Sequence, residues 1–194
     1  MFRIKNIKKY FVFMLMIFSV NNIFSQKISV PIDVQLELVP KILTLNKNFT
    51  NLIKKPDIHI GIIFSSLVKS SASIKDKIMK YVSDKKIFVR DKRLIFIPLD
   101  IAKIKDLQKQ FQRDDLQSIY ITPLRAYNIE IISKICKEEK IISFSSVSDY
   151  LKDKISIGFE LVNSKVKIAI NISSAKEEGA NFSSHLLKIA EIRG

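Results

Sequence analysis

Apolar residues recur along this chain with two periods, and segments of the two kinds alternate. Short, nearly continuous apolar runs predict strands buried on both faces of a parallel sheet, at 58–64, 94–98, 118–122 and 141–144. Between them, apolar residues repeat every three or four positions, which predicts helices over 74–82, 101–111 and 128–139. Strands that alternate with helices of this length indicate βαβ units and a mainly parallel sheet.

An earlier helix is predicted over 29–45. Pro31 lies near its first position, where the missing N–H costs little, whereas Pro40 falls inside it and predicts a kink or a break. Apolar residues occupy two sides of this segment. We therefore expect the helix to be sandwiched within the protein or to contact a partner.

Polar side chains suited to capping precede three of the helices. Ser73 and Asp76 have the spacing of a capping box before the helix at 74–82. Asp100 and Asn128 precede the next two helices and are expected to cap them. These residues set the predicted helix starts.

The last forty residues have a different pattern from the alternating strands and helices before them. Two strictly alternating segments, 155–162 and 165–171, flank Asn163-Ser164, which predicts an antiparallel hairpin with one buried face. A final helix is predicted over 184–192. The expected fold is thus α/β, with a single open, mainly parallel sheet flanked by helices, closed by a C-terminal antiparallel β-hairpin and a covering helix.

Residues 1–25 read as a cleavable secretory signal. A basic start is followed by an apolar core at 10–20 and a cleavage site at Ile23-Phe24-Ser25. The apolar core is about half the ~20 residues that span a bilayer, which weighs against the alternative, an uncleaved anchor. We expect residues 26–194 to form one periplasmic domain.

The chain has a formal net charge of +14, which raises the question of whether it binds a polyanion such as nucleic acid or an anionic membrane. The lysines are scattered, without an arginine cluster or an interleaved aromatic platform, which argues against nucleic acid. The charge is compatible with at most peripheral contact with an anionic membrane surface.

Stretches of the C-terminal region match a family signature that pairs a strand with an "AxxxG…FSxxLLxLA" segment. They are 158–161, Lys167-Ile168-Ala169-Ile170-Asn171-Ile172, 175–180 and Phe182-Ser183-Ser184-His185-Leu186-Leu187-Lys188-Ile189-Ala190. With 30–45 and Tyr120-Ile121-Thr122-Pro123-Leu124-Arg125, they make the chain resemble the YfiR family of small periplasmic proteins. Some members carry cysteine pairs, but Cys136 is the only cysteine here, so no internal disulfide can form.

The resemblance implies a non-enzymatic regulator that binds and restrains the periplasmic part of an inner-membrane signalling protein, of diguanylate cyclase or histidine kinase type. The candidate contact surfaces are the first helix, the loop at Arg125 and the final helix around Phe182 and His185. Self-association through one of these surfaces is also open.

The residues themselves carry no catalytic motif, and no cofactor or metal site is predicted. His59, His185 and Cys136 are too far apart in the sequence for a metal site. His59 is expected to be a hydrogen-bonded core histidine. Cys136 lies on an apolar helix face and is expected to be buried, although an intermolecular disulfide stays open.

An alternative function is a small-anion or solute-binding module. Ligands of open α/β sheets bind at the carboxyl ends of the strands. There the sequence places hydroxyls and one guanidinium: Ser65, Ser66, Thr122, Arg125, Ser145 and Ser146. This set suits a small anion beside helix N-termini.

Overall fold

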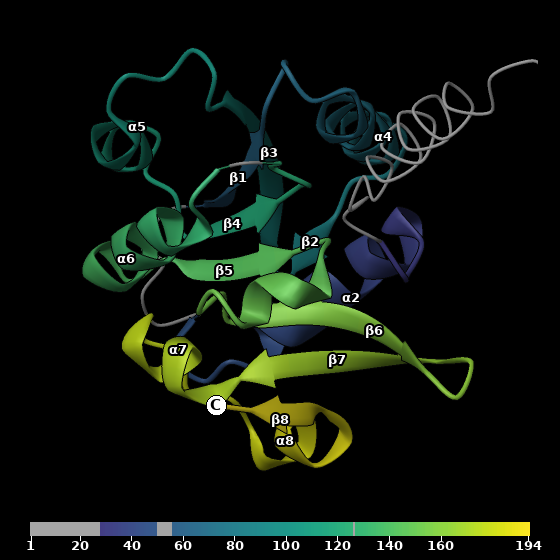
Figure 1. The fold of residues 1–194 in the computed structure, drawn as a ribbon. Helices are drawn as coiled ribbons and strands as arrows, with labels where there is room; N and C mark the ends of the chain where they lie inside the picture. Colours follow the sequence, from purple (N-terminus) through teal and green to yellow (C-terminus); the bar gives the residue numbers. More distant parts are fainter. Residues whose placement is uncertain (1–27, 50–55, 126) are drawn as a thin grey trace, which may run out of the picture.

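The structure is a computed structural model that describes residues 28–49, 56–125 and 127–194. These residues form one eight-stranded sheet with helices on both faces (Figure 1). The predicted signal segment, 1–25, lies outside the described residues.

The strand order across the sheet is β2-β3-β1-β4-β5-β6-β7-β8. The strands are β1 (Asp57–Phe64), β2 (Phe88–Val89), β3 (Lys92–Asp100), β4 (Ser118–Ile121), β5 (Ile142–Ser145), β6 (Ile157–Val162), β7 (Lys165–Asn171) and β8 (Glu191–Arg193). Only the β2–β3 and β6–β7 pairs are antiparallel. The predicted mainly parallel sheet with a C-terminal hairpin is therefore confirmed.

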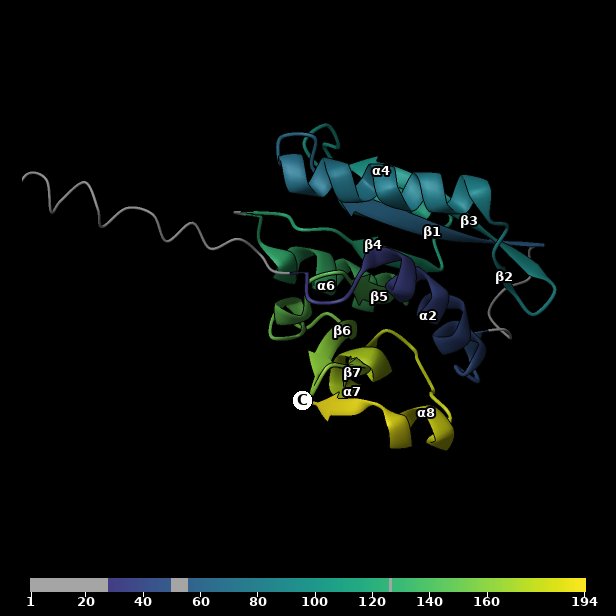
Figure 2. The same cartoon turned by 90° about the vertical axis from the view of Figure 1, so that its right-hand side faces the viewer.

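The helices divide between the two faces (Figures 1 and 2). They are α2 (Ile32–Thr44), α4 (Lys69–Asp84), α5 (Leu107–Arg113), α6 (Ile129–Glu139), the 3-10 turn η1 (Ser148–Leu151), α7 (Ile172–Glu177) and α8 (Ser184–Ile189). Side chains of α2, α4, α7 and α8 join one apolar cluster, and those of α5 and α6 join a second cluster on the opposite face. Strand β1 contributes to both clusters, as its continuous apolar run predicts.

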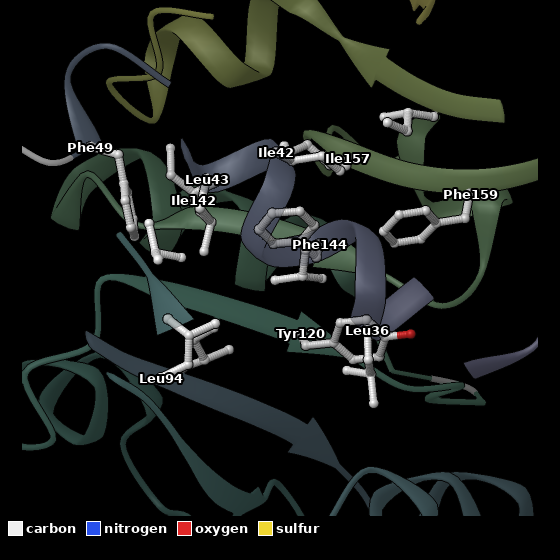
Figure 3. Close-up of a cluster of buried hydrophobic side chains, with 14 of the residues drawn as sticks. Leu36, Ile42, Leu43, Phe49, Leu94, Tyr120, Ile142, Phe144, Ile157 and Phe159 are labelled. Atoms are coloured by element: carbon white, nitrogen blue, oxygen red, sulfur yellow. The ribbon is translucent and has the colours of Figure 1, made fainter. Parts of the chain in front are cut away.

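The larger cluster lies between α2 and the sheet (Figure 3). Phe144 of β5 and Phe159 of β6 stack with ring centroids 6.5 Å apart. Tyr120 is fully buried and donates its hydroxyl to Gln35 Oε1 at 2.5 Å, which ties β4 to α2. Both apolar sides of α2 pack in the larger cluster, but Asp33, Glu37 and Lys41 are exposed, so the helix covers the sheet and keeps one side open.

Of the kink or break predicted at Pro40, the break is wrong, because α2 continues past this residue to Thr44. A proline inside a helix removes one backbone hydrogen bond and costs ~3 kcal/mol or more. Here the buried neighbours Val39, Ile42 and Leu43 hold the helix against the larger cluster. Tertiary packing therefore outweighs the local penalty.

Two predicted helix starts are also wrong. Helix α4 begins at Lys69 after Val68, so Ser73 and Asp76 lie inside the helix and form no capping box. Helix α5 begins only after Asp106, whose carboxylate accepts the Lys109 N–H at 3.0 Å. The third cap is correct, because the Asn128 side chain accepts the N–H of Glu130 at the start of α6.

Asp100, the cap predicted for α5, ends strand β3 instead. Its carboxylate accepts backbone N–H groups of Ser66 at 3.0 Å and Ala102 at 3.2 Å. It therefore fastens the turn after β3 to the end of β1. The Asp100 carboxylate thus accepts backbone N–H groups, as a helix cap does, but these groups belong to the turns after β1 and β3.

The C-terminal hairpin turns where predicted, with φ of 49° at Asn163 and 60° at Ser164. The final helix, however, is shorter than expected. Helix α8 stops at Ile189, Ala190 is extended, and Glu191–Arg193 adds β8 parallel to β7. Helical periodicity in the last residues is overridden by backbone pairing with the strand beside them.

Candidate functional site

The strand-end hydroxyl of Thr122 is buried and bonded within the protein. Its Oγ1 donates to the carbonyl oxygen of Ile63 at 3.0 Å and lies 2.6 Å from the hydroxyl of Ser71 on α4. The Ser71 hydroxyl also accepts the backbone N–H of Ser65 at 2.9 Å. This network joins the ends of β1 and β4 to α4.

Ser145 and Ser146 at the end of β5 are also buried. Ser146 Oγ donates to the carbonyl oxygen of Ile121 at 3.1 Å, and Ser145 Oγ accepts the N–H of Val147 at 3.0 Å. The fold brings the predicted hydroxyls to one edge of the sheet. Their polar atoms stabilise the strand ends in this conformation.

Arg125 lies apart from these buried hydroxyls and is exposed. A pocket of about 500 Å³ is lined by Leu67, Val68, Lys69, Ser70, Ser73 and Arg125. Among the described residues, none forms a hydrogen bond or ion pair with the Arg125 guanidinium. The pocket therefore combines an unpaired guanidinium with the first turn of α4.

Phe182 and His185, the candidates near the last helix, differ in exposure. Phe182 is 6% exposed, packs in the larger cluster, and pairs its backbone with Asn46. His185 on α8 is exposed. Of these two side chains, only His185 is available to a partner in this conformation.

Two apolar residues at the tip of the β6–β7 hairpin are exposed, although their alternation predicted a buried face. Leu161 is 48% exposed and Val166 is 37% exposed, and the two residues are directly paired across the strands. They share a face with the buried Phe159 and Ile168, because side chains two residues apart lie on the same side of a strand. The hairpin extends beyond the helices that cover its base (Figure 1). We call Leu161 and Val166 the hairpin-tip pair.

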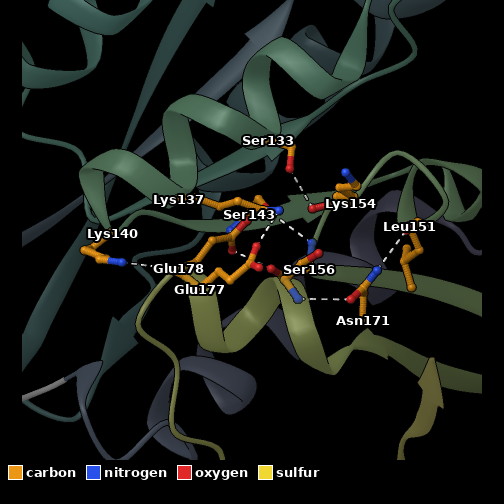
Figure 4. Close-up of polar contacts among 11 residues, drawn as sticks. Ser133, Lys137, Lys140, Ser143, Leu151, Lys154, Ser156, Asn171, Glu177 and Glu178 are labelled. Atoms are coloured by element: carbon orange, nitrogen blue, oxygen red, sulfur yellow. Dashed lines mark hydrogen bonds and ion pairs between the residues drawn. The ribbon is translucent and has the colours of Figure 1, made fainter. Parts of the chain in front are cut away.

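A buried carboxylate that the sequence did not single out lies at the amino ends of β5 and β6. Glu178, just after α7, accepts hydrogen bonds from Ser143 N at 2.8 Å, Ser143 Oγ at 2.6 Å and Ser156 Oγ at 2.5 Å (Figure 4). Ser143 Oγ in turn accepts the N–H of Ser156 at 2.9 Å. These three residues, the Glu178 cluster, join α7 to two strands of the sheet.

Burial raises the pKa of Glu178 from 4.5 to about 7, although its hydrogen bonds with the two serines oppose the rise. The adjacent Glu177 is exposed and pairs with Lys137 of α6 at 2.5 Å. No local pattern marks Glu178, because its partners lie 35 and 22 residues away in the sequence. The hydrogen bonds of the cluster hold α7 against β5 and β6, and their contribution to folding stability depends on the protonation of Glu178.

Cys136 is buried as expected, whereas His59 is hydrogen-bonded as expected but only half-buried, so it is not a core residue. His59 Nδ1 lies 2.8 Å from the carbonyl oxygen of Asp114. Cys136 is fully buried on α6, and burial, with the Glu178 carboxylate nearby, raises the pKa of its thiol. A thiol held in its protonated form is a poor nucleophile.

Across residues 28–49, 56–125 and 127–194, no three His, Cys, Asp or Glu side chains are grouped so that they could hold a metal ion. Within the same residues, no helix has the length and apolar character needed to cross a membrane.

Solved structures with a similar fold come from several bacteria. A conserved domain protein from Vibrio cholerae aligns with a TM-score of 0.60 at 15% identity, over 84% of this chain and 60% of that one. A substrate binding protein with adhesive properties from Clostridium difficile, in its ligand-free, open structure, gives 0.57 at 13% identity, over 84% and 60%. An ABC domain in complex with L-Trp from Streptococcus pneumoniae gives 0.53 at 11% identity, over 78% and 60%.

At these identities the likeness shows the fold alone. The chain spans about three fifths of the length of each of these structures. Among curated proteins, none matches the sequence.

The family comparison covers most of the chain. Residues 67–191 match the profile described as YfiR/HmsC-like, a range that runs from the start of α4 to β8. It includes Arg125, the hairpin-tip pair and the Glu178 cluster. The chain belongs to the YfiR/HmsC-like family.

Proposed function

We propose that this protein is an exported regulator that binds the periplasmic part of an inner-membrane signalling protein, of diguanylate cyclase or histidine kinase type, and restrains it. The observation that carries the proposal is the family match over residues 67–191, since membership supports a periplasmic regulatory role. The site chemistry agrees with it, because the described polar clusters are used to hold strands and helices together.

The partner surface that we propose is centred on the hairpin-tip pair. Four of the seven large apolar residues that are exposed in the described chain lie in its last 34 residues: Leu161, Val166, Ile189 and Ile192. Ile192 pairs with Ile170 at the other end of β7, whereas Leu161 and Val166 are directly paired with each other. Adjacent exposed apolar side chains of this kind are typical of protein contact sites. The tip projects from the body of the fold, so a partner can reach it without unfolding any helix (Figure 1).

Restraint follows if the partner domain has two conformations and the hairpin tip binds the inactive one more tightly. The bound regulator then shifts the population towards that conformation. A differential affinity of a few kcal/mol is sufficient for such a shift.

The first prediction concerns this pair. The double substitution Leu161→Ser and Val166→Ser should lower affinity for the partner's periplasmic domain by about tenfold or more, because apolar contacts at the centre of an interface carry most of its energy. Isothermal titration against the purified partner domain, captured first by cross-linking in membranes, measures the effect.

Ile131→Ser provides a matched control. Ile131 on α6 is also 48% exposed, but it lies on the opposite face of the sheet. This variant should bind the partner as the unmodified protein does. Equal affinity of the double variant and the control would reject the hairpin tip as the contact.

A small-anion or solute site is the second candidate function. It is supported by the unpaired Arg125 in its pocket, whereas the buried hydroxyls of Thr122 and Ser146 already have partners within the protein. If this function holds, phosphate or sulfate should raise the melting temperature, and Arg125→Ala should abolish the increase. Thermal denaturation with and without each anion checks this, and a chloride series controls for ionic strength. An increase that survives Arg125→Ala would reject the pocket.

A further inference from the structure

The outer face of α4 carries a row of unpaired lysines. Lys69, Ser73, Lys77 and Lys80 are spaced four, four and three residues apart, so they lie on one side of the helix over about 16 Å. All three lysines are exposed, and within the described residues none of them pairs with a carboxylate. Figure 2 shows α4 lying along the outside of the molecule.

A groove of about 640 Å³ follows this row, lined by Ser66, Leu67, Lys69, Ala72, Ser73, Asp76, Lys77 and Lys80. Asp76 is the only acidic residue among them, and its carboxylate is paired with Lys75. The positive charge of the groove is therefore not neutralised from within.

An apolar side chain stands at one end of the row. Leu67, two residues before the start of α4, is 85% exposed, the largest exposure among the large apolar residues described. Water around such a side chain is costly, and insertion into an apolar medium removes that cost. The same surface thus offers an aliphatic anchor and several cations.

This combination fits a lipid surface better than a protein. Interface cores between proteins are depleted in lysine and enriched in aromatic residues and arginine. Lysines near an anionic bilayer are attracted by its surface potential, and a neighbouring apolar residue inserts among the headgroups. We propose that the Leu67–Lys80 face of α4 docks on the surface of an anionic phospholipid bilayer.

The docking face is separate from the hairpin-tip pair, so one molecule can rest on a bilayer through α4 and present its hairpin to a membrane-bound partner. The proposal does not depend on that partner. Loss of vesicle binding and loss of partner binding are distinguished by different variants.

The experiment is co-sedimentation of the exported protein with vesicles of phosphatidylglycerol and phosphatidylethanolamine, beside vesicles of phosphatidylcholine alone. We expect binding to the anionic vesicles that weakens at high salt. Lys69→Gln, Lys77→Gln and Lys80→Gln together should lower vesicle affinity by about a hundredfold, and Leu67→Ser alone by about tenfold. Every variant is exported with the same N-terminal segment, so differences between variants report on α4.

The matched control removes the same charge elsewhere. Lys134, Lys137 and Lys140 lie on or directly after α6, on the opposite face of the sheet from α4. Lys134 pairs with Glu138 at 3.8 Å and Lys137 with Glu177 at 2.5 Å. Their triple substitution by Gln should leave vesicle affinity within about twofold of the unmodified protein, because charges beyond a screening length contribute little. Equal losses in the two triple variants would overturn the proposal, since net charge alone would then explain binding.

Two other results would also overturn it. One is equal binding to neutral and anionic vesicles. The other is binding of inorganic phosphate or of polyglutamate to the α4 face without any binding to vesicles, which would assign the face to a free anion or to an acidic protein. Circular dichroism of each variant confirms that the exposed substitutions leave the fold intact.

Discussion

Replacing Phe144 by alanine should destabilise the protein by about 3–5 kcal/mol, the range for removing a large aromatic side chain from a well-packed core. Phe144 is fully buried at the centre of the larger cluster and stacks on Phe159 (Figure 3). The residues around it come from α2, β4 and β6, so they cannot all move inward to fill the space. Urea denaturation followed by circular dichroism measures the loss.

Phe88→Ala is the control for this prediction. Phe88 on β2 is 49% exposed, so its removal should change stability by no more than about 0.5 kcal/mol, as for most surface substitutions. A loss below about 1 kcal/mol for Phe144→Ala would show that this cluster is not the close-packed centre of the fold.

The second large effect is a dependence of stability on pH set by Glu178. Its pKa is about 7 in the folded protein and 4.5 as a free side chain, so folding favours the protonated form. The resulting stabilisation is complete below pH 4.5, declines as the pH rises from 4.5 to 7, and is absent above that range. The expected difference is about 3 kcal/mol.

Glu178→Gln should remove this dependence. The amide oxygen can accept hydrogen bonds from Ser143 N and Ser156 Oγ, and the amide N–H can donate to Ser143 Oγ, because a hydroxyl has two acceptor lone pairs. The free energy of unfolding of this variant should be nearly constant between pH 4.5 and 7.5. The unmodified protein should lose stability over the same interval.

Glu177→Gln provides the control from the adjacent residue. Hydrogen bonding to Lys137 and the charge of that lysine lower the pKa of Glu177, so its contribution is present above pH 4.5 and is lost only as the pH falls further. This variant should keep the decline between pH 4.5 and 7 that the unmodified protein shows. If Glu178→Gln declines just as steeply, Glu178 is not the group responsible.

The sequence predicted correctly those parts of the fold that depend on residues adjacent in the chain. The continuous apolar run of β1, the Asn128 cap of α6 and the Asn163-Ser164 turn each depend on a few adjacent residues, and each is found as expected. The starts of α4 and α5 were misplaced, because several side chains able to cap a helix lie close together there. The structure selects among them through tertiary contacts, such as that of Asp100 with Ser66.

The candidate surfaces were harder to predict for a related reason. Alternation places Leu161 and Val166 on the apolar face of the hairpin, but it cannot tell where the covering helices end. Glu178 is one of several carboxylates in a charged segment until the fold brings Ser143 and Ser156 to it. The buried state of Thr122, Ser145 and Ser146 likewise depends on contacts between strands.

The most direct test of the proposed regulation is the output of the signalling protein in cells, measured as cyclic di-GMP for a cyclase or as phosphorylated response regulator for a kinase. Deleting this protein should raise the output, and supplying the unmodified chain or Ile131→Ser should return it to the starting level. The Leu161→Ser, Val166→Ser double variant, exported at the same level, should fail to do so. An output that does not change on deletion would contradict the account, as would full restoration by the double variant.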